Sequence, residues 1–524
     1  MVSRSTNLQP LMCHQQLWPW LWSLLGVSLC FRVLWLHRIP GINGDEAWYG
    51  VQVQRWLAGG SSSFLTPSRL PVNPMLLVTE MGLLRFVGPS FADPGRLFMA
   101  VHLAAALLCS RLTWTLVRLC LNGARWQPLL YLWVMWGGGL FSLSTLIENL
   151  CVAKPALFEL LRHDPGSGWW FLNWGRNLVY PTESVYHALM AATWIAVLRE
   201  RWLVALWSAA LLASTHPFSG LQVLLILAAW CAISLRLRPS WRVPLWFSGG
   251  TVSLLVLFLS YNLLFLGLFE QHRELVRNWS VKWTLDWAAT WRAYLPLAAI
   301  AAVRCWRERG QMDRTARFLL TCWATSFLLA NHDWFVRPHQ PVHFTRGYIW
   351  MPLCLLGLPM LEGTLLWLSN TRRRLFCGLV PLLLAAVLAV SDNAAFLVQY
   401  AQRRAEYGFF LTPAVRDLFR QMREHDLRGV LLPPNPRLGY LLAVYTRARP
   451  YLGLAFNTPS FYERQRQMMD WFANGQGGPW FSIIDYVLVP RVGGLRHGSA
   501  DRWREVLAND EWTLLECPRA GVSE

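Results

Sequence analysis

Apolar stretches of membrane-spanning length recur along almost the whole of this 524-residue chain. A transmembrane helix needs about 20 predominantly apolar residues, and most of these stretches are close to that length. With 54% hydrophobic and only 15% charged residues, the chain is too apolar for a soluble protein of this size. We therefore expect its main body to be an all-α polytopic membrane protein.

We predict about eleven transmembrane helices, of which 183–198 and 202–214 are short. The predicted limits are 17–36, 97–119, 127–147, 183–198, 202–214, 217–235, 244–268, 289–304, 316–331, 347–368 and 375–399. Many of the 32 tryptophans flank these stretches, which is typical of the membrane interface.

The charged residues of the loops predict the orientation. With the N-terminus in the cytoplasm, the cytoplasmic segments hold 16 basic and 3 acidic residues. The opposite loops hold 13 basic and, with Glu183 at the mouth of a span included, 12 acidic residues. Lys and Arg collect in short cytoplasmic loops, so this arrangement is favoured. The first outer loop, 37–96, and the tail from about Tyr400 then face outward.

The net charge of +18 does not indicate nucleic-acid binding, because the basic residues lie in short loops between apolar stretches. The 11 cysteines are scattered and include no CxxC pair, so they predict buried apolar side chains rather than a metal site. We therefore expect no nucleic-acid partner and no metal held by cysteines.

The tail, residues 400–524, is the one part with a soluble composition. Val430–Leu432 and 486–489 have the pattern of buried strands, and 413–423 and 461–473 have that of amphipathic helices. We expect a small extracytoplasmic α/β domain here, after a transmembrane module that comprises residues 1–399.

Asp45 and Glu46 lie just after the first apolar stretch, in the segment GDEAWYG. Carboxylates at the edge of a bilayer are costly unless they face water or a partner, so such a pair is a functional hypothesis. An interfacial helix is predicted after them, ending at Gly59-Gly60, and 74–87 is apolar but too short to cross.

Together these features resemble the polyprenyl-phosphate-dependent glycosyltransferases of the GT-C fold, especially the protein O-mannosyltransferase and aminoarabinose lipid A transferase group. The likeness covers roughly residues 15–130: the first span followed by GDEAWYG, the interfacial helix followed by NPMLLVTEMGLLRFVG, and Arg96 leading into the second span. Asn73 stands where that group usually has an aromatic residue or His.

The resemblance implies that a sugar is moved from a polyprenyl-phosphate donor to an acceptor on the outer side. Asp45 would be the general base, and Glu46 would orient the acceptor or the base, or help to bind a divalent cation, which is possible but not required. Capping of the interfacial helix by these acids is the structural alternative. The sugar and the acceptor, whether lipid, glycan or protein, stay open.

A second polar region is the outer loop NHDWFVRPHQPVHFTRGY, residues 331–348. An arginine side chain can form bidentate hydrogen bonds with phosphate oxygens. We therefore expect Arg337 or Arg346 to bind the phosphate of the lipid-linked sugar donor, with His343 or His216 assisting. Contact with lipid headgroups is the alternative. We expect the following residues to line the substrate cavity: Tyr49, Asn73, Glu183, His187 and His332.

The sequence thus predicts a glycosyltransferase that is integral to the plasma membrane, of the bacterial inner-membrane type, in contact with membrane lipids. The competing function is a polytopic transporter or lipid flippase of the cell envelope. Transporters often have paired repeats with broken helices at matching places, and no such duplication is present in this sequence.

Overall fold

A computed structural model of the chain describes residues 94–121, 126–151, 171–175, 181–236, 242–270, 273, 283–371, 392–393, 396, 411–453, 458, 460–475, 477–492 and 503–517. The chain divides into two compact units. One contains residues 1–33, 101–260 and 281–403, and the other contains residues 34–100, 261–280 and 404–524.

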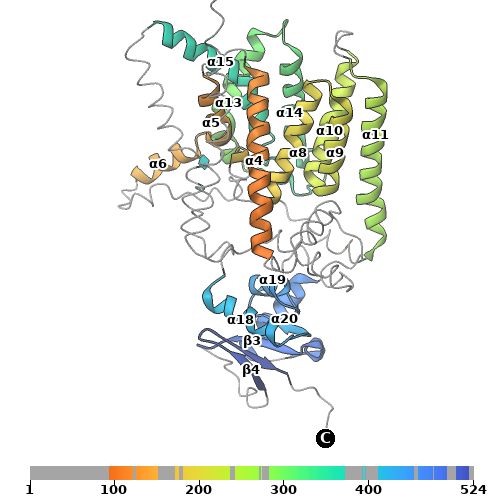
Figure 1. Ribbon diagram of the computed structural model, residues 1–524, viewed down its shortest axis with the longest axis vertical. Coiled ribbons are helices and arrows are strands. Elements are labelled where there is room, and N and C mark those ends of the chain that lie inside the picture. Colours follow the sequence, from red (N-terminus) through yellow and green to blue (C-terminus); the bar gives the residue numbers. More distant parts are fainter. Residues whose placement is uncertain are drawn as a thin grey trace, which may run out of the picture. The chain divides into compact units, whose positions relative to one another are not determined.

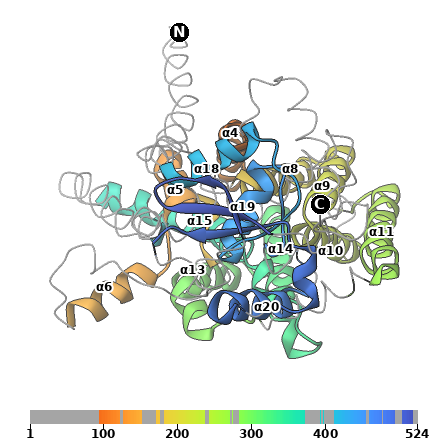
Figure 2. The same ribbon diagram turned by 90° about the horizontal axis from the view of Figure 1, so that it is seen from below.

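The described part of the first unit is built mainly from α-helices (Figure 1). Its described helices are α4 (Pro94–Cys120), α5 (Gln127–Trp136), α6 (Phe141–Cys151), α8 (Pro181–Leu198), α9 (Trp202–Thr215), α10 (Pro217–Ser234), α11 (Leu245–Leu259), α13 (Trp287–Arg307), α14 (Arg314–Ala330) and α15 (Trp350–Thr371). Helix α10 packs against α9, α11 and α14, and the end-on view shows this grouping (Figure 2).

Within the described residues, three helices are long and apolar enough to cross a membrane: Pro217–Ser234, Leu245–Leu268 and Trp350–Trp367. The last turns of Leu245–Leu268 are a π-helix (Ser260–Phe265) and a 3₁₀-helix (Leu266–Leu268). Large apolar side chains on it, such as Leu245 and Leu257, are exposed, as expected of a helix that faces lipid.

The other predicted spans between 97 and 368 also correspond to helices, with α8 and α9 short and apolar as expected. The predicted helical membrane body is therefore confirmed. The span at 17–36 lies outside the described residues, as does all of 375–399 except 392, 393 and 396, so the count of eleven stays a prediction.

The predicted span at 127–147 is broken in the structure, because α5 and α6 form a pair bent by 68°. The break is at Gly137–Gly139, where a side chain at Gly139 would lie 2.1 Å from the carbonyl oxygen of Ala293. Asp392 stabilises the backbone at this break. Its carboxylate accepts hydrogen bonds from the backbone N–H groups of Gly139 (2.7 Å) and Ser142 (2.8 Å). This buried carboxylate satisfies amide groups at the beginning of α6 that the helix itself cannot.

The second unit contains a five-stranded mixed sheet of order β2-β1-β3-β5-β4. Its strands are β1 (Val430–Leu432), β2 (Arg449–Pro450), β3 (Tyr486–Pro490), β4 (Arg504–Ala508) and β5 (Trp512–Glu516). Strand β1 is parallel to β2 and β3, whereas β5 is antiparallel to β3 and β4. The helices are α18 (Pro413–Glu424), α19 (Pro436–Tyr445) and α20 (Phe461–Asn474). The strands and helices predicted from the pattern of the tail are thus confirmed.

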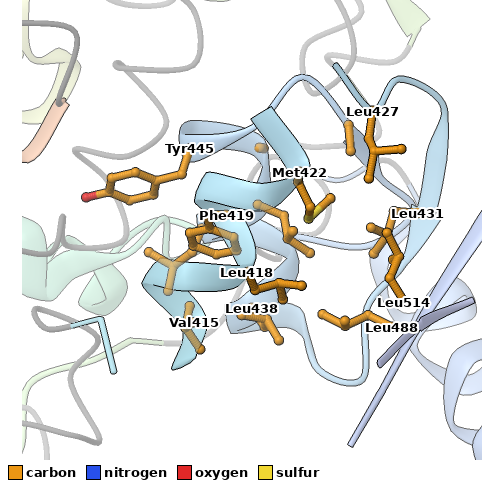
Figure 3. Close-up of a cluster of buried hydrophobic side chains, with 14 of the residues drawn as sticks. Val415, Leu418, Phe419, Met422, Leu427, Leu431, Leu438, Tyr445, Leu488 and Leu514 are labelled. Carbon is orange, nitrogen blue, oxygen red and sulfur yellow. The ribbon is translucent and has the colours of Figure 1, made fainter. Parts of the chain in front are cut away.

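Successive strand residues face opposite sides of this sheet, as the pleat requires. Leu431, Leu488 and Leu514 pack with α18 and α19 on one side, and Figure 3 shows Leu418, Phe419 and Met422 of α18 pointing into this cluster. The alternate residues, including Leu432 and Val487, pack with α20 on the other side. Thr412 and Asn435 cap α18 and α19, and each is followed by a proline at the first helical position.

Candidate functional site

Polar side chains from three segments of the first unit meet in one buried cluster. The segments are the first turns of α8, the turn between α9 and α10, and the connection 331–349 between α14 and α15. The connection contains two short 3₁₀-helices, η7 (His332–Trp334) and η8 (Pro341–Phe344). It is tied to α10 by Gln222, whose side-chain amide donates to the carbonyl of Phe344 at 3.0 Å.

The opposite ends of these helices are held together by a different set of charges. Arg314 at the beginning of α14 pairs with Glu200 in the turn between α8 and α9. Arg304 pairs with Glu308 at 3.1 Å near the end of α13. Two of the segments that the charge pattern assigned to the cytoplasm, 199–202 and 304–317, therefore meet at the opposite end of α8 from the cluster.

Arg346 and Glu183 form a buried ion pair at the centre of the cluster. A guanidinium nitrogen of Arg346 donates to Oε1 of Glu183 at 2.9 Å, and their side chains are 4% and 9% exposed. The other terminal nitrogen donates to Nδ1 of His343 at 2.6 Å. A buried pair of this kind is costly to break, because removing one partner leaves an uncompensated charge in a medium of low dielectric constant.

The imidazole of His343 is held between aromatic rings. It stacks on Phe218, with centroids 4.4 Å apart, and meets Trp283 edge-on at 5.4 Å. Since Nδ1 accepts from Arg346, the proton of the neutral ring is on Nε2. Burial, followed by the charge of Arg346, lowers the pKa of His343 well below its ordinary value of 6.5.

His216 is the N-cap of α10, and its Nδ1 accepts from the backbone N–H of Ser219 at 3.1 Å. Its ring stacks on Tyr186 at 4.3 Å. Burial lowers the pKa of His216 well below 6.5, with further contributions from Arg346, His343 and His187. Both His216 and His343 are therefore neutral in this arrangement near pH 7.

His187 joins the two parts of the cluster. Its Nε2 is 4.0 Å from Oε2 of Glu183, and its Nδ1 is 3.0 Å from the hydroxyl of Tyr348. The hydroxyl of Tyr348 in turn donates to Oγ of Ser219 at 3.2 Å. The sequence did not single out Tyr348 or Ser219, although each lies within three residues of a predicted site residue.

Two predicted residues lie apart from this centre. Both ring nitrogens of His332 are used within its own connection: Nδ1 bonds to the carbonyl of Leu329 at 2.6 Å, and Nε2 accepts from the N–H of His339 at 2.9 Å. These bonds give His332 a structural role in shaping the loop. The side chain of Arg337 is exposed, whereas that of Arg346 is buried.

Asp45, Glu46, Tyr49 and Asn73 lie outside the described residues. Among the residues that are described, no group of three or more His, Cys, Asp or Glu side chains is arranged to hold a metal ion.

The buried neutral histidines predict that the folded protein loses stability in acid. An unfolded chain binds a proton at each of these histidines as the pH falls below 6.5, whereas the folded chain does not until a much lower pH. Stability is therefore complete above 6.5 and declines below it, by about 1.4 kcal/mol per pH unit for each such histidine.

This loss can be measured by unfolding the purified protein in detergent between about pH 7.5 and pH 5.5. His343→Gln removes one of the two groups and is expected to reduce the decline. The matched control is His425→Gln, an exposed histidine of the second unit, which is expected to leave the decline unchanged. An identical decline in all three proteins would contradict a neutral buried His343.

The packed apolar helices are those of a polytopic membrane protein. Comparison with solved structures confirms, at the level of fold, the resemblance to the GT-C fold indicated by the sequence. The chain is similar to the aminoarabinose lipid A transferase ArnT from Cupriavidus metallidurans in two crystal structures. With ArnT bound to undecaprenyl phosphate, the TM-score is 0.52 at 13% identity, over 94% of this chain and 98% of ArnT.

With ArnT in the apo state, the TM-score is again 0.52, at 14% identity over 94% of this chain and 97% of ArnT. No protein-family model and no curated protein matches the chain. The likeness therefore establishes the fold, and the chemistry has to be argued from the residues of this chain.

Proposed function

We propose that this protein is a membrane glycosyltransferase that moves a sugar from a polyprenyl-phosphate donor to an acceptor on the extracytoplasmic side. The observation that carries the proposal is the buried cluster of Arg346, Glu183 and His343 at the predicted outer end of the helices. The neighbour of the same fold was crystallised with undecaprenyl phosphate, which supports a donor of this chemical class.

Arg346 is the residue we assign to the donor phosphate. The lipid phosphate is the leaving group, so it needs positive charge and hydrogen-bond donors rather than a general acid. Arg346 supplies both, and its burial makes its charge more effective than that of the exposed Arg337. His343 can add a further donor, because the proton of its neutral ring is on Nε2 while Nδ1 accepts from Arg346.

Asp45 is the group we assign to proton removal from the acceptor hydroxyl or amine, with Glu46 orienting the acceptor or helping to bind a divalent cation. This assignment is supported by the position of the acidic pair in the first outer loop. Sugar transfer from a lipid phosphate passes through a state with oxocarbenium character, and a nearby carboxylate can take the acceptor proton.

The proposal includes an arrangement in the membrane. The N-terminus is cytoplasmic, residues 1–399 form the transmembrane catalytic module, and residues 400–524 form an extracytoplasmic domain. The balance of charges in the loops supports this orientation.

The test is a transfer assay with membranes that contain the protein and a radiolabelled polyprenyl-phosphate sugar. We expect labelled sugar to become attached to an endogenous acceptor by a new glycosidic bond, with release of the polyprenyl phosphate. Membranes without the protein are the control. Movement of the intact labelled lipid across the bilayer, with no new bond, would instead identify the transporter or flippase.

A further inference from the structure

A continuous chain of hydrogen bonds connects His187 to the beginning of α10. Nδ1 of His187 is 3.0 Å from the hydroxyl of Tyr348, which donates to Oγ of Ser219 at 3.2 Å. Oγ of Ser219 is in turn 3.0 Å from Nδ1 of His216. His187 and Ser219 and Tyr348 are fully buried, and His216 is nearly so.

The backbone at the beginning of α10 sets the direction of this chain. The N–H of Ser219 donates to Nδ1 of His216, so this nitrogen is an acceptor. The hydroxyl of Ser219 can then donate to it as well, while its oxygen accepts from Tyr348. Because the hydroxyl hydrogen of Tyr348 is used in this bond, its oxygen accepts from His187, and the proton of the His187 ring is on Nδ1.

The position of this proton matters for Glu183. With the proton on Nδ1, the lone pair of Nε2 faces Oε2 of Glu183 across 4.0 Å, which is longer than a hydrogen bond. The neutral ring therefore does not draw the carboxylate away from Arg346, which donates to Oε1 at 2.9 Å. The opposite tautomer would present an N–H to Glu183 and compete with Arg346.

The backbone also links the two ends of this system. Arg346 and Tyr348 are separated by Gly347, whose φ of +77° is in the left-handed region, and Arg346 itself has a φ of +23°. A side chain at Gly347 would lie 2.8 Å from Trp174, the residue that stacks on His187 at 5.3 Å. One strained turn thus presents the guanidinium and the tyrosine hydroxyl to the same pair of residues on α8.

We propose that Tyr348 is a positioning residue: together with Ser219 and His216, it keeps the proton of His187 on Nδ1. In this tautomer His187 does not compete for the carboxylate of Glu183, which therefore remains paired with Arg346. Arg346 is then held in the orientation in which it meets the donor phosphate. This last step rests on the proposed function, whereas the tautomer of His187 does not.

The test removes one hydroxyl at a time. Tyr348→Phe deletes the acceptor of the His187 N–H, and Ser219→Ala deletes the next hydroxyl in the chain of hydrogen bonds. If one variant does not fold, the other still tests whether these hydroxyls set the tautomer of His187. Tyr131→Phe is the matched control, because its buried hydroxyl bonds to the carbonyl of Ser110 in the same unit, and neither residue belongs to this chain of hydrogen bonds.

Two measurements are made on each purified protein. The first is the ¹⁵N NMR signal of the His187 ring, assigned by its loss in His187→Gln, which distinguishes a proton on Nδ1 from one on Nε2. The second is the affinity for undecaprenyl phosphate. We expect the signal of the Nδ1 tautomer in the wild type and in Tyr131→Phe. In Tyr348→Phe and Ser219→Ala we expect it to be lost or diminished, with binding weaker by about 3- to 10-fold.

A His187 ring that keeps its proton on Nδ1 in both Tyr348→Phe and Ser219→Ala would overturn the proposal. So would unchanged affinity for undecaprenyl phosphate in these variants when Arg346→Ala weakens it. If the wild type binds undecaprenyl phosphate no better than it binds phosphatidylcholine, the proposed function fails instead, and the NMR signal still decides whether Tyr348 positions His187.

Discussion

Replacement of Arg346 by alanine is expected to lower kcat/KM for the lipid-linked donor by about 10²- to 10³-fold, the cost typical of removing one charged or hydrogen-bonding group from a leaving oxygen. The guanidinium is buried and has its donors directed at Glu183 and His343, so no exposed cation can take over its position. The measurement is the initial rate of sugar transfer as a function of donor concentration.

The same substitution also destabilises the fold, because it leaves Glu183 buried without its cation, which typically costs about 3–5 kcal/mol. The double variant Glu183→Gln with Arg346→Gln separates the two effects. The double variant removes both charges, so we expect it to be more stable than Arg346→Ala. Its kcat/KM for the lipid-linked donor is expected to be as low as that of Arg346→Ala. Recovery of both stability and activity in the double variant would mean that Arg346 is only structural.

Arg337→Ala is the control that the loop itself offers, since the side chain of Arg337 is exposed and belongs to the same connection. We expect this substitution to change kcat/KM for the lipid-linked donor only slightly, because an exposed charge is screened by water and salt. A larger loss in Arg337→Ala than in Arg346→Ala would assign the phosphate to Arg337.

The elements of the second unit were predictable because their signals are local. The short apolar run Val430–Leu432 and the helical spacing that begins at Pro413 each occupy one short window. A proline after a capping Thr or Asn marks where α18 and α19 begin. Nothing in such windows gives the strand order, because β1 pairs with β3 across about fifty intervening residues.

The membrane helices were predictable for the same reason, and the exception is informative. Hydropathy alone favours one unbroken helix over 127–147, whereas the segment forms two short helices bent at Gly137–Gly139, where the carboxylate of Asp392 binds. Three consecutive glycines were a visible local signal for a break. The acceptor that holds the break is some 250 residues away in the sequence, and no window of the sequence contains both.

The sequence identified many of the charged and ionisable members of the cluster, because such groups are conspicuous beside apolar stretches. It did not connect Glu183 to Arg346, which is 163 residues away. Tyr348 and Ser219 were not predicted as site residues, because a hydroxyl carries no charge and these residue types are common in any chain. The two ring nitrogens of His332 bond within its own connection, which no local pattern of the sequence indicates, and its place in the substrate cavity stays a prediction.

Replacement of Asp45 by asparagine is expected to lower kcat by about 10²- to 10⁴-fold, the usual contribution of a general base. Asparagine has nearly the same shape and can still accept a hydrogen bond, but it cannot take the acceptor proton at neutral pH. In the proposed mechanism the donor phosphate is bound by Arg346 rather than by this carboxylate, so KM for the donor is expected to change little.

This contrast separates the two proposed roles. Arg346→Ala should weaken donor binding, whereas Asp45→Asn should bind donor as the wild type does and fail in the transfer step. Glu46→Gln is the neighbouring control, and a group that only orients the acceptor should cost less than the base itself. Asp45→Asn with wild-type kcat would show that Asp45 is not the general base. Asp45→Asn with lost donor affinity would instead assign Asp45 to donor binding, because loss of a general base slows proton transfer without weakening binding of the lipid phosphate.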